Sequence, residues 1–240
     1  MQVLVTKDYA AMSRAAADIF KEHLKNHPQT VLGLATGSTP LGMYEWLIKY
    51  HQDGLDFSQV TTFNLDEYIG LAGDHPASYR YFMEEHLFGH VNVPKERIFI
   101  PNGMAEDPEA ECRAYDELIR KLGGIDLQVL GIGVNGHIGF NEPGTPFEAT
   151  THVAELTAST REANARFFAS IDEVPTHAIS MGIKSIMHAR RIVLLANGEH
   201  KAEAVAAAVK GPVTPDLPAS VLQLHPDVTF VVDEAAGRLL

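Results

Sequence analysis

The stretch VLGLATGSTP at positions 31–40 decides the fold, because an uninterrupted apolar run passes there into a polar turn. The apolar part, residues 31–34, lacks the alternation of a half-exposed strand and predicts a strand that is covered on both faces. A helical pattern follows at Leu41–Tyr50. A strand, a turn and a helix in this order are typical of a mostly parallel sheet that lies between helices.

The same order recurs along the chain. Further strands without alternation are predicted at Gln2–Val5, Val60–Asn64, Asp126–Leu130, Ile192–Ala196 and Val228–Val232. Helices are expected after Asp8 and after Asp107-Pro108, where a capping residue precedes an amphipathic stripe. No linker, repeat or low-complexity tract interrupts this pattern, so residues 1–240 are expected to form one domain.

The composition limits the possible partners and the compartment. The net charge is −12, and the basic residues form no cluster beyond Arg190-Arg191, which argues against nucleic acid or an anionic membrane as a partner. The single cysteine, Cys112, cannot form an internal disulfide, and the apolar run before Lys7 is too short for a signal peptide. No apolar run reaches about 18 residues, the length that spans a membrane. We therefore expect a cytoplasmic protein.

Ligands of such sheets bind beyond the carboxyl ends of the strands, and residues 35–40 lie at the first of these ends. The hydroxyls and backbone N–H groups of Thr36, Gly37, Ser38 and Thr39 could hold a phosphate at the start of the following helix. The alternative is an ordinary helix cap with Pro40 at the first helical position. The motif is not a P-loop, because no Gly-Lys-Ser/Thr follows.

A carboxylate follows the strand at Val60–Asn64. Asp66 could face the ligand crevice and act as a base in proton transfer. The alternative is a polar turn that closes the strand, since adjacent Asp and Glu residues are common on protein surfaces.

The segment at positions 131–142 follows a further strand. Residues 131–136, GIGVNG, match G-x-G-x-x-G, but the glycines and prolines after them make a helix improbable, so no dinucleotide cofactor is expected. His137 lies near Asn135 and Glu142 in sequence and could form a hydrogen-bonded proton relay with them. The alternative is a core histidine bonded to a backbone carbonyl.

Other charged residues give weaker indications. Arg166 could bind a phosphate or pair with Glu162, four residues earlier on a probable helix. Lys201 lies at an expected helix start, where the helix dipole disfavours it, so it could have an anionic partner or be a solvated lysine. His86 and His90 lack the glutamate of the zinc-protease motif, and no metal is expected there.

The chain resembles the glucosamine-6-phosphate deaminase family from near residue 30 to near residue 230. The Asn-Glu-Pro ending of the histidine segment is the specific part, because the related phosphogluconolactonases usually have a Leu-Phe-Pro type of sequence there. The matching segments are ATGSTP (35–40), TFNLDEY (62–68), HPASY (75–79), GVNGHIGFNEP (133–143), TREANARFF (160–168) and LQLHP (222–226).

This resemblance implies an open, Rossmann-like α/β fold with helices on both faces. It implies conversion of the sugar phosphate glucosamine 6-phosphate, with water, to fructose 6-phosphate and ammonia, without a cofactor or a metal. His137 would open the sugar ring, Glu142 would orient it, and Asp66 would carry the proton between C2 and C1. Tyr79 would lie on a mobile lid, and the phosphate would be held by Thr36, Gly37, Ser38, Thr39, Arg166 and Lys201.

Two departures from longer family members affect the interpretation. Some members have aspartate at the position of Asn135. The side-chain oxygen of the asparagine can still accept a hydrogen bond from a ring N–H.

Some members are hexamers that N-acetylglucosamine 6-phosphate activates. The activator binds through basic residues in the segment after Asn-Glu-Pro and a longer C-terminal tail. Here His152 and Ala154 lie in that segment, which has no Lys or Arg before Arg161, and the chain ends at Leu240. We therefore expect hyperbolic kinetics and a monomer or small homo-oligomer.

Two other functions remain open. A hydrolase similar to 6-phosphogluconolactonase would use the same phosphate cradle and histidine, but it would not need Asp66 as a carbon base. A sugar-phosphate-binding regulator would keep the fold without turnover. The presence of Asp66, His137 and Glu142 argues against the second function, as does the absence of a basic patch.

Overall fold

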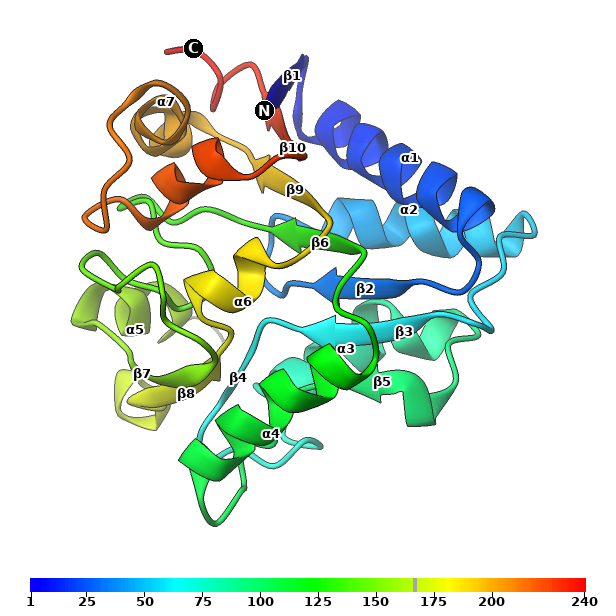
Figure 1. The fold of residues 1–240 in the computed structure, drawn as a ribbon, viewed down its shortest axis with the longest axis vertical. Coiled ribbons are helices and arrows are strands. Elements are labelled where there is room, and N and C mark those ends of the chain that lie inside the picture. Colours follow the sequence, from blue (N-terminus) through cyan, green and yellow to red (C-terminus); the bar gives the residue numbers. More distant parts are fainter. Residues whose placement is uncertain (166–167) are drawn as a thin grey trace.

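A computed structural model of the chain describes residues 1–165 and 168–240, and Figure 1 shows how its elements are arranged. Within these residues, seven strands form a sheet in which every neighbouring pair is parallel. The order across the sheet is β1 (Gln2–Thr6), β10 (Val228–Asp233), β9 (Arg191–Ala196), β6 (Leu127–Leu130), β2 (Val31–Leu34), β3 (Thr61–Asn64) and β5 (Ile98–Phe99).

Helices cover both faces of this sheet. On one face α1 (Tyr9–Asn26) packs against α2 (Leu41–Gln52), whereas α4 (Pro108–Lys121) and α6 (Ile183–Met187) lie on the opposite face (Figure 1). The remaining helices are α3 (Tyr79–His86), α5 (Ala158–Asn164) and α7 (Ala202–Lys210). This architecture confirms the open, mostly parallel, Rossmann-like α/β fold that the sequence predicts.

The helix starts follow the predicted capping chemistry. The Asp8 carboxylate accepts a hydrogen bond from the Ala11 N–H at 2.9 Å, and α1 begins one residue after it. The Asp107 carboxylate accepts from the Ala110 N–H at 3.0 Å, with proline at the first position of α4. Each cap satisfies a donor that the helix itself leaves unpaired.

The first strand differs from its prediction. The strands β6 and β10 are fully buried, as runs without alternation predict, but β1 is mostly exposed. The side chains of Val3, Leu4 and Val5 keep 39%, 42% and 48% of their surface accessible. The reason is position: β1 is the edge strand next to β10, and the pattern of apolar residues does not show which strand lies at an edge.

A second, smaller sheet was not predicted from the sequence. It consists of β4 (Asp66–Tyr68), β8 (His177–Ser180) and β7 (His152–Glu155), and its pairs are antiparallel. The chain enters it directly from β3 through Leu65, so the second sheet lies beyond the carboxyl end of the first. None of the helices in the described part of the chain has the length and apolar character that a membrane crossing requires.

Candidate active site

The three polar segments at the strand ends meet around one cavity of about 310 Å³. Residues 35–40 follow β2, Leu65 and Asp66 follow β3, and residues 131–139 follow β6. The cavity lies at the carboxyl ends of the strands, where a parallel sheet is expected to bind a ligand. Five further residues outside these segments line the cavity, namely Tyr79, Phe140, Thr160, Asn164 and Lys201.

The loop of residues 35–40 presents backbone donors to this cavity. The helix α2 begins at Leu41, and no side chain caps it, so the alternative of an ordinary helix cap is wrong. Gly37 has a φ of 97°, in the left-handed region that favours glycine. Uncapped N–H groups at a helix start favour an anion such as phosphate.

Two tyrosines on the side of this loop away from the cavity bond to its backbone, and no pattern in the sequence indicates them. The Tyr9 hydroxyl donates to the Ser38 carbonyl at 3.0 Å and accepts from the Gly42 N–H at 2.9 Å. The buried Tyr44 hydroxyl bonds to both backbone groups of Ala35. These bonds fix the backbone of the cradle before any ligand arrives.

Asp66 lies on the cavity wall as the first residue of β4. It is not in a polar turn, so that alternative is wrong. Only 7% of its surface is accessible, and no donor among the described residues forms a hydrogen bond with its carboxylate. Burial, together with the charge of the neighbouring Glu67, raises the pKa of Asp66 to about 8. Asp66 is therefore a basic, unpaired carboxylate that faces the ligand space.

Glu67 anchors the helix that carries Tyr79, a role that the sequence did not indicate. Its buried carboxylate accepts hydrogen bonds from the N–H groups of Tyr68, Tyr79 and Arg80 at 2.9–3.0 Å. Burial raises the pKa of Glu67, and these donors oppose that effect. The Tyr79 ring lies near the rings of Tyr68 and Phe140, with centroids 4.6 and 6.2 Å away. The position of Tyr79 beside the cavity agrees with the sequence, whereas the lid motion remains a prediction.

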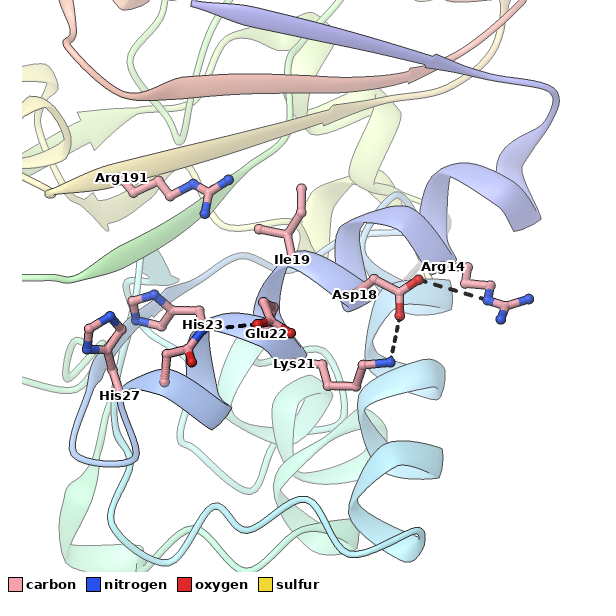
Figure 2. A pocket seen from close by; sticks show the side chains of 9 residues that line it. Arg14, Asp18, Ile19, Lys21, Glu22, His23, His27 and Arg191 are labelled. Atoms are coloured by element: carbon pink, nitrogen blue, oxygen red, sulfur yellow. Dashed lines mark hydrogen bonds and ion pairs between the residues drawn. The ribbon is translucent and has the colours of Figure 1, made fainter.

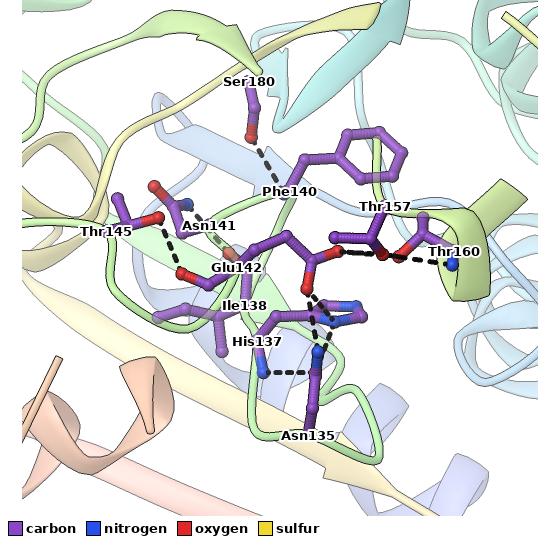
Figure 3. Close-up of polar contacts among 10 residues, drawn as sticks. All are labelled: Asn135, His137, Ile138, Phe140, Asn141, Glu142, Thr145, Thr157, Thr160 and Ser180. Atoms are coloured by element: carbon purple, nitrogen blue, oxygen red, sulfur yellow. Dashed lines mark hydrogen bonds and ion pairs between the residues drawn. The ribbon is translucent and has the colours of Figure 1, made fainter. Parts of the chain in front are cut away.

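His137, Asn135 and Glu142 form a connected relay (Figure 3). His137 Nδ1 lies 2.7 Å from Asn135 Oδ1, and Asn135 Nδ2 donates to Glu142 Oε2 at 2.8 Å. Because the Asn135 amide donates to the carboxylate, its oxygen faces the ring and Nδ1 carries the proton. The other ring nitrogen, Nε2, is then an acceptor in the neutral imidazole. The alternative of a core histidine bonded to a backbone carbonyl is wrong.

Glu142 is kept in its charged form by hydrogen-bond donors around its carboxylate. Burial opposes its ionisation, but the nearby His137 ring, together with hydrogen bonds from Thr160 and Asn135, lowers the pKa of Glu142 to about 2. The Thr160 hydroxyl donates to Glu142 Oε1 at 2.6 Å. His137 Nδ1 lies 3.6 Å from Glu142 Oε2, so the nearer contact of the ring is Asn135 and the carboxylate acts through it.

Lys201 adds a positive charge to the cavity. It is partly buried, and this burial lowers the pKa of its ammonium group. Within the part of the chain that the structure describes, no carboxylate pairs with it, so the interpretation as a solvated surface lysine is not supported. The predicted phosphate ligand Arg166 lies outside the described residues.

A second hollow, of about 640 Å³, lies away from this cavity, along the outer face of α1 near the start of β9 (Figure 2). Its charged side chains pair with one another or with neighbours: Asp18 lies 3.0 Å from Lys21, and Arg191 lies 3.8 Å from Asp227. Because Arg191 begins β9, this hollow lies at the amino-terminal edge of the sheet, where ligands are not expected. His86 and His90 also lie outside the cavity.

Comparisons with known proteins agree with this geometry. A glucosamine-6-phosphate deaminase of Thermoanaerobacter pseudethanolicus is 58% identical, over 100% of this chain and 95% of the relative. One of Clostridium perfringens is 56% identical over 100% of both chains. The solved structure of a monomeric glucosamine-6-phosphate deaminase has a TM-score of 0.98 and 51% identity over 100% of both chains.

A more distant structure shares the fold alone. The 6-phosphogluconolactonase from Trypanosoma brucei has a TM-score of 0.81 and 19% identity, over 100% of this chain and 98% of that one. The family model for glucosamine-6-phosphate isomerases/6-phosphogluconolactonase matches residues 7–231. Since this match spans almost the whole sheet and all three segments of the cavity, the chain belongs to the glucosamine-6-phosphate isomerase/6-phosphogluconolactonase family.

Proposed function

We propose that this protein is a glucosamine-6-phosphate deaminase, which converts glucosamine 6-phosphate and water to fructose 6-phosphate and ammonia. The observation that carries the proposal is the unpaired, buried carboxylate of Asp66 in the same cavity as the His137 relay. An aldose–ketose conversion needs a carbon base and a proton carrier for the ring oxygens, and these two groups supply both.

The phosphate binds first in this scheme. The backbone and hydroxyls of Thr36, Gly37, Ser38 and Thr39 receive it, and Lys201 and Arg166 balance its charge. Binding at this end of the sugar holds C1 and C2 near the catalytic groups, so binding energy is used for orientation.

His137 then opens the ring. Its Nε2 acceptor takes the proton of the C1 hydroxyl, and the imidazolium delivers a proton to the ring oxygen as the C1–O bond breaks. The positive charge that forms on the ring is stabilised through Asn135 by the carboxylate of Glu142, whose low pKa keeps it ionised.

Asp66 carries out the isomerisation. Its carboxylate removes the proton from C2 while the C1 oxygen takes a proton from the ammonium group on C2, which gives an enolamine. The Asp66 carboxyl then returns its proton to C1, which gives a protonated imine at C2. Water adds to this imine and ammonia leaves, so the product is the ketose. The raised pKa suits Asp66 to this role, because a stronger base takes a carbon-bound proton more readily and holds it between the two steps.

We also propose that residues 1–240 act as one domain, as a monomer or small homo-oligomer in the cytoplasm, where its phosphorylated substrate would be retained. The test is incubation of the purified protein with glucosamine 6-phosphate, with ammonia and fructose 6-phosphate measured separately. Equal amounts of both products are expected. Hydrolysis of 6-phosphogluconolactone without ammonia release would instead favour the lactonase function, and binding without turnover would favour a regulator.

A further inference from the structure

The two oxygens of the Glu142 carboxylate have different partners (Figure 3). Oε2 faces the relay and accepts from Asn135 Nδ2 at 2.8 Å. Oε1 faces α5, where the Thr160 hydroxyl donates to it at 2.6 Å. The Thr157 hydroxyl lies farther from the same oxygen, at 3.4 Å. Thr160 therefore makes the short contact on the side of the carboxylate away from His137.

The start of α5 is built so that the Thr160 hydroxyl points at this carboxylate. Thr157 caps the helix by accepting from the Thr160 N–H at 3.2 Å, and its hydroxyl donates to Thr160 Oγ1 at 2.9 Å. Thr160 thus accepts one hydrogen bond and passes its own proton to Glu142, an arrangement in which each bond strengthens the next. Thr160 and Asn164 both line the cavity, as residues four apart on one helix face do.

We propose that Thr160 is a positioning residue for the reaction: its hydroxyl fixes the rotation of the Glu142 carboxylate so that Oε2 faces Asn135 and His137. This inference rests on the proposed function. The terminal torsion of a glutamate is broad and has no strong preference of its own, so a partner must set it. The bond from Thr160 also helps to lower the pKa of Glu142 to about 2, and without it that pKa rises.

The test uses three variants. Thr160→Val removes the hydroxyl with little change of shape, whereas Thr160→Ser keeps it. Thr145→Val is the matched control, because the Thr145 hydroxyl donates to the main-chain oxygen of Glu142 at 2.7 Å and not to its carboxylate. Circular dichroism and thermal melting check that each variant is folded.

Thr160→Val is expected to lower kcat about tenfold to a hundredfold, the effect of losing a hydrogen bond to a charged group, with a smaller change in KM. Thr160→Ser should restore kcat, and Thr145→Val should keep the wild-type kcat and KM. A purely structural role of Thr160 would change the melting temperature or KM without this selective fall in kcat.

A second readout needs no turnover. NMR spectra of the protein labelled with nitrogen-15 histidine report the protonation of the two His137 ring nitrogens, assigned with His137→Gln. We expect Thr160→Val to change the His137 signals and Thr160→Ser to preserve them. A folded Thr160→Val with wild-type His137 signals, or with wild-type kcat, would overturn the inference. If the wild-type protein releases no ammonia, the proposed function fails, and the NMR result alone decides the role of Thr160.

Discussion

Asp66 differs from Glu67 and Asp233, the other buried carboxylates in the described part of the chain, because no donor there forms a hydrogen bond with it. It is almost completely buried, and the charge of Glu67 lies beside it, so the pKa of Asp66 is raised to about 8. Glu142 is also partly buried, yet its donors lower its pKa to about 2. Two carboxylates in one site whose environments drive their pKa values apart are suited to distinct roles: in the proposed mechanism Asp66 exchanges protons and Glu142 stays charged.

The first test removes the base. Asp66→Asn should lower kcat for deamination by about 10²–10⁴-fold, the range for loss of a general base, because an amide cannot accept the C2 proton. Binding of an unreactive sugar phosphate, measured by calorimetry, should change little, since Asp66 is not in the phosphate cradle. Near-normal turnover by the folded variant would show that another group is the base.

The pKa of Asp66 also predicts a pH dependence. As pH rises towards about 8, a growing fraction of Asp66 in the free enzyme becomes ionised and able to take a proton. We therefore expect kcat/KM for glucosamine 6-phosphate to rise between about pH 6 and pH 8. Measurement of initial rates over this range in buffers of constant ionic strength provides the test. A flat profile would contradict a base with a raised pKa.

The sequence indicates the residues proposed to react but not the residues that support them. Asp66, Asn135 and His137 were predicted because each lies just beyond a strand, and the carboxyl ends of parallel strands meet. Tyr9, Glu67 and Thr160 have no such marker. Each acts on a residue that the folded chain brings near, for example Thr160 on Glu142, 18 positions away. Their partners depend on how helices dock, which local patterns do not specify.

At the scale of elements, the turn between β9 and α7 sets the position of Lys201. Gly198 has a φ of 87°, and its N–H donates to both carboxylate oxygens of Asp233 at 3.0 Å. Asp233 ends the neighbouring strand β10 and also accepts from the Ala236 N–H at 2.8 Å. The Lys201 N–H in turn donates to the Gly198 carbonyl at 3.1 Å. The end of one strand thereby holds the loop that carries Lys201, the proposed phosphate-binding lysine.

Asp233→Asn should therefore weaken substrate binding. In this variant only one of the two atoms that face the Gly198 N–H can still accept it, and the negative charge is lost. The turn therefore loosens, and KM for glucosamine 6-phosphate should rise up to about tenfold, the effect of weakening a charge-assisted hydrogen bond. Lys201→Ala should raise KM at least as much. Steady-state kinetics test both variants, and kcat should fall much less than KM rises.

Asp227→Asn is the control for this variant. Asp227 lies just before the same strand, but at its other end, where it pairs with Arg191. Its replacement should leave KM unchanged. If Asp233→Asn binds the substrate as tightly as the wild type does, the turn does not need this carboxylate to place Lys201.

Patterns of apolar residues are sufficient to predict some strands of this fold but not others. The inner strands of the main sheet were found because they are buried on both faces. The strands of the second sheet were missed, because β4 has only 3 residues, Asp-Glu-Tyr, and gives no apolar run. This small sheet forms only when β8 pairs with β4 from more than a hundred positions away. It nevertheless carries Asp66, so the least predictable element holds the proposed base.

At the scale of the whole molecule, the proposed base costs stability at high pH. The folded pKa of Asp66 is raised from 3.8 to about 8, so the stability that comes from its neutral form is fully present below pH 3.8 and is lost as pH rises through 8. Glu142 has the opposite sign. Its contribution is present above pH 4.5, the ordinary pKa, and is lost as pH falls through about 2.

The Tm of Asp66→Asn minus the Tm of the wild type should therefore be larger at pH 9 than at pH 4. A chain of this size shifts its Tm by about 2–4 °C for each kcal/mol, so the difference is measurable by calorimetry. Glu155→Gln serves as a control, because Glu155 is exposed and should show no such trend. A Tm difference that stays constant between the two pH values would mean that Asp66 is ionised as easily in the folded protein as in the unfolded chain.

The last expectation concerns regulation of the whole molecule. Activation by N-acetylglucosamine 6-phosphate, as in some family members, requires a second site with positive partners for the phosphate. The segment between Glu142 and Arg161 contains no Lys or Arg. In the structure this segment includes β7, where His152 Nδ1 bonds to the Thr150 carbonyl and Ala154 is buried.

We therefore expect a hyperbolic dependence of rate on glucosamine 6-phosphate, unchanged by N-acetylglucosamine 6-phosphate except for competition at the active site. Substrate titrations with and without this compound, alongside light scattering at the assay concentration, test this expectation. A sigmoidal curve that the compound makes hyperbolic would require a second site elsewhere, because a ligand shifts an equilibrium only through differential affinity for two states.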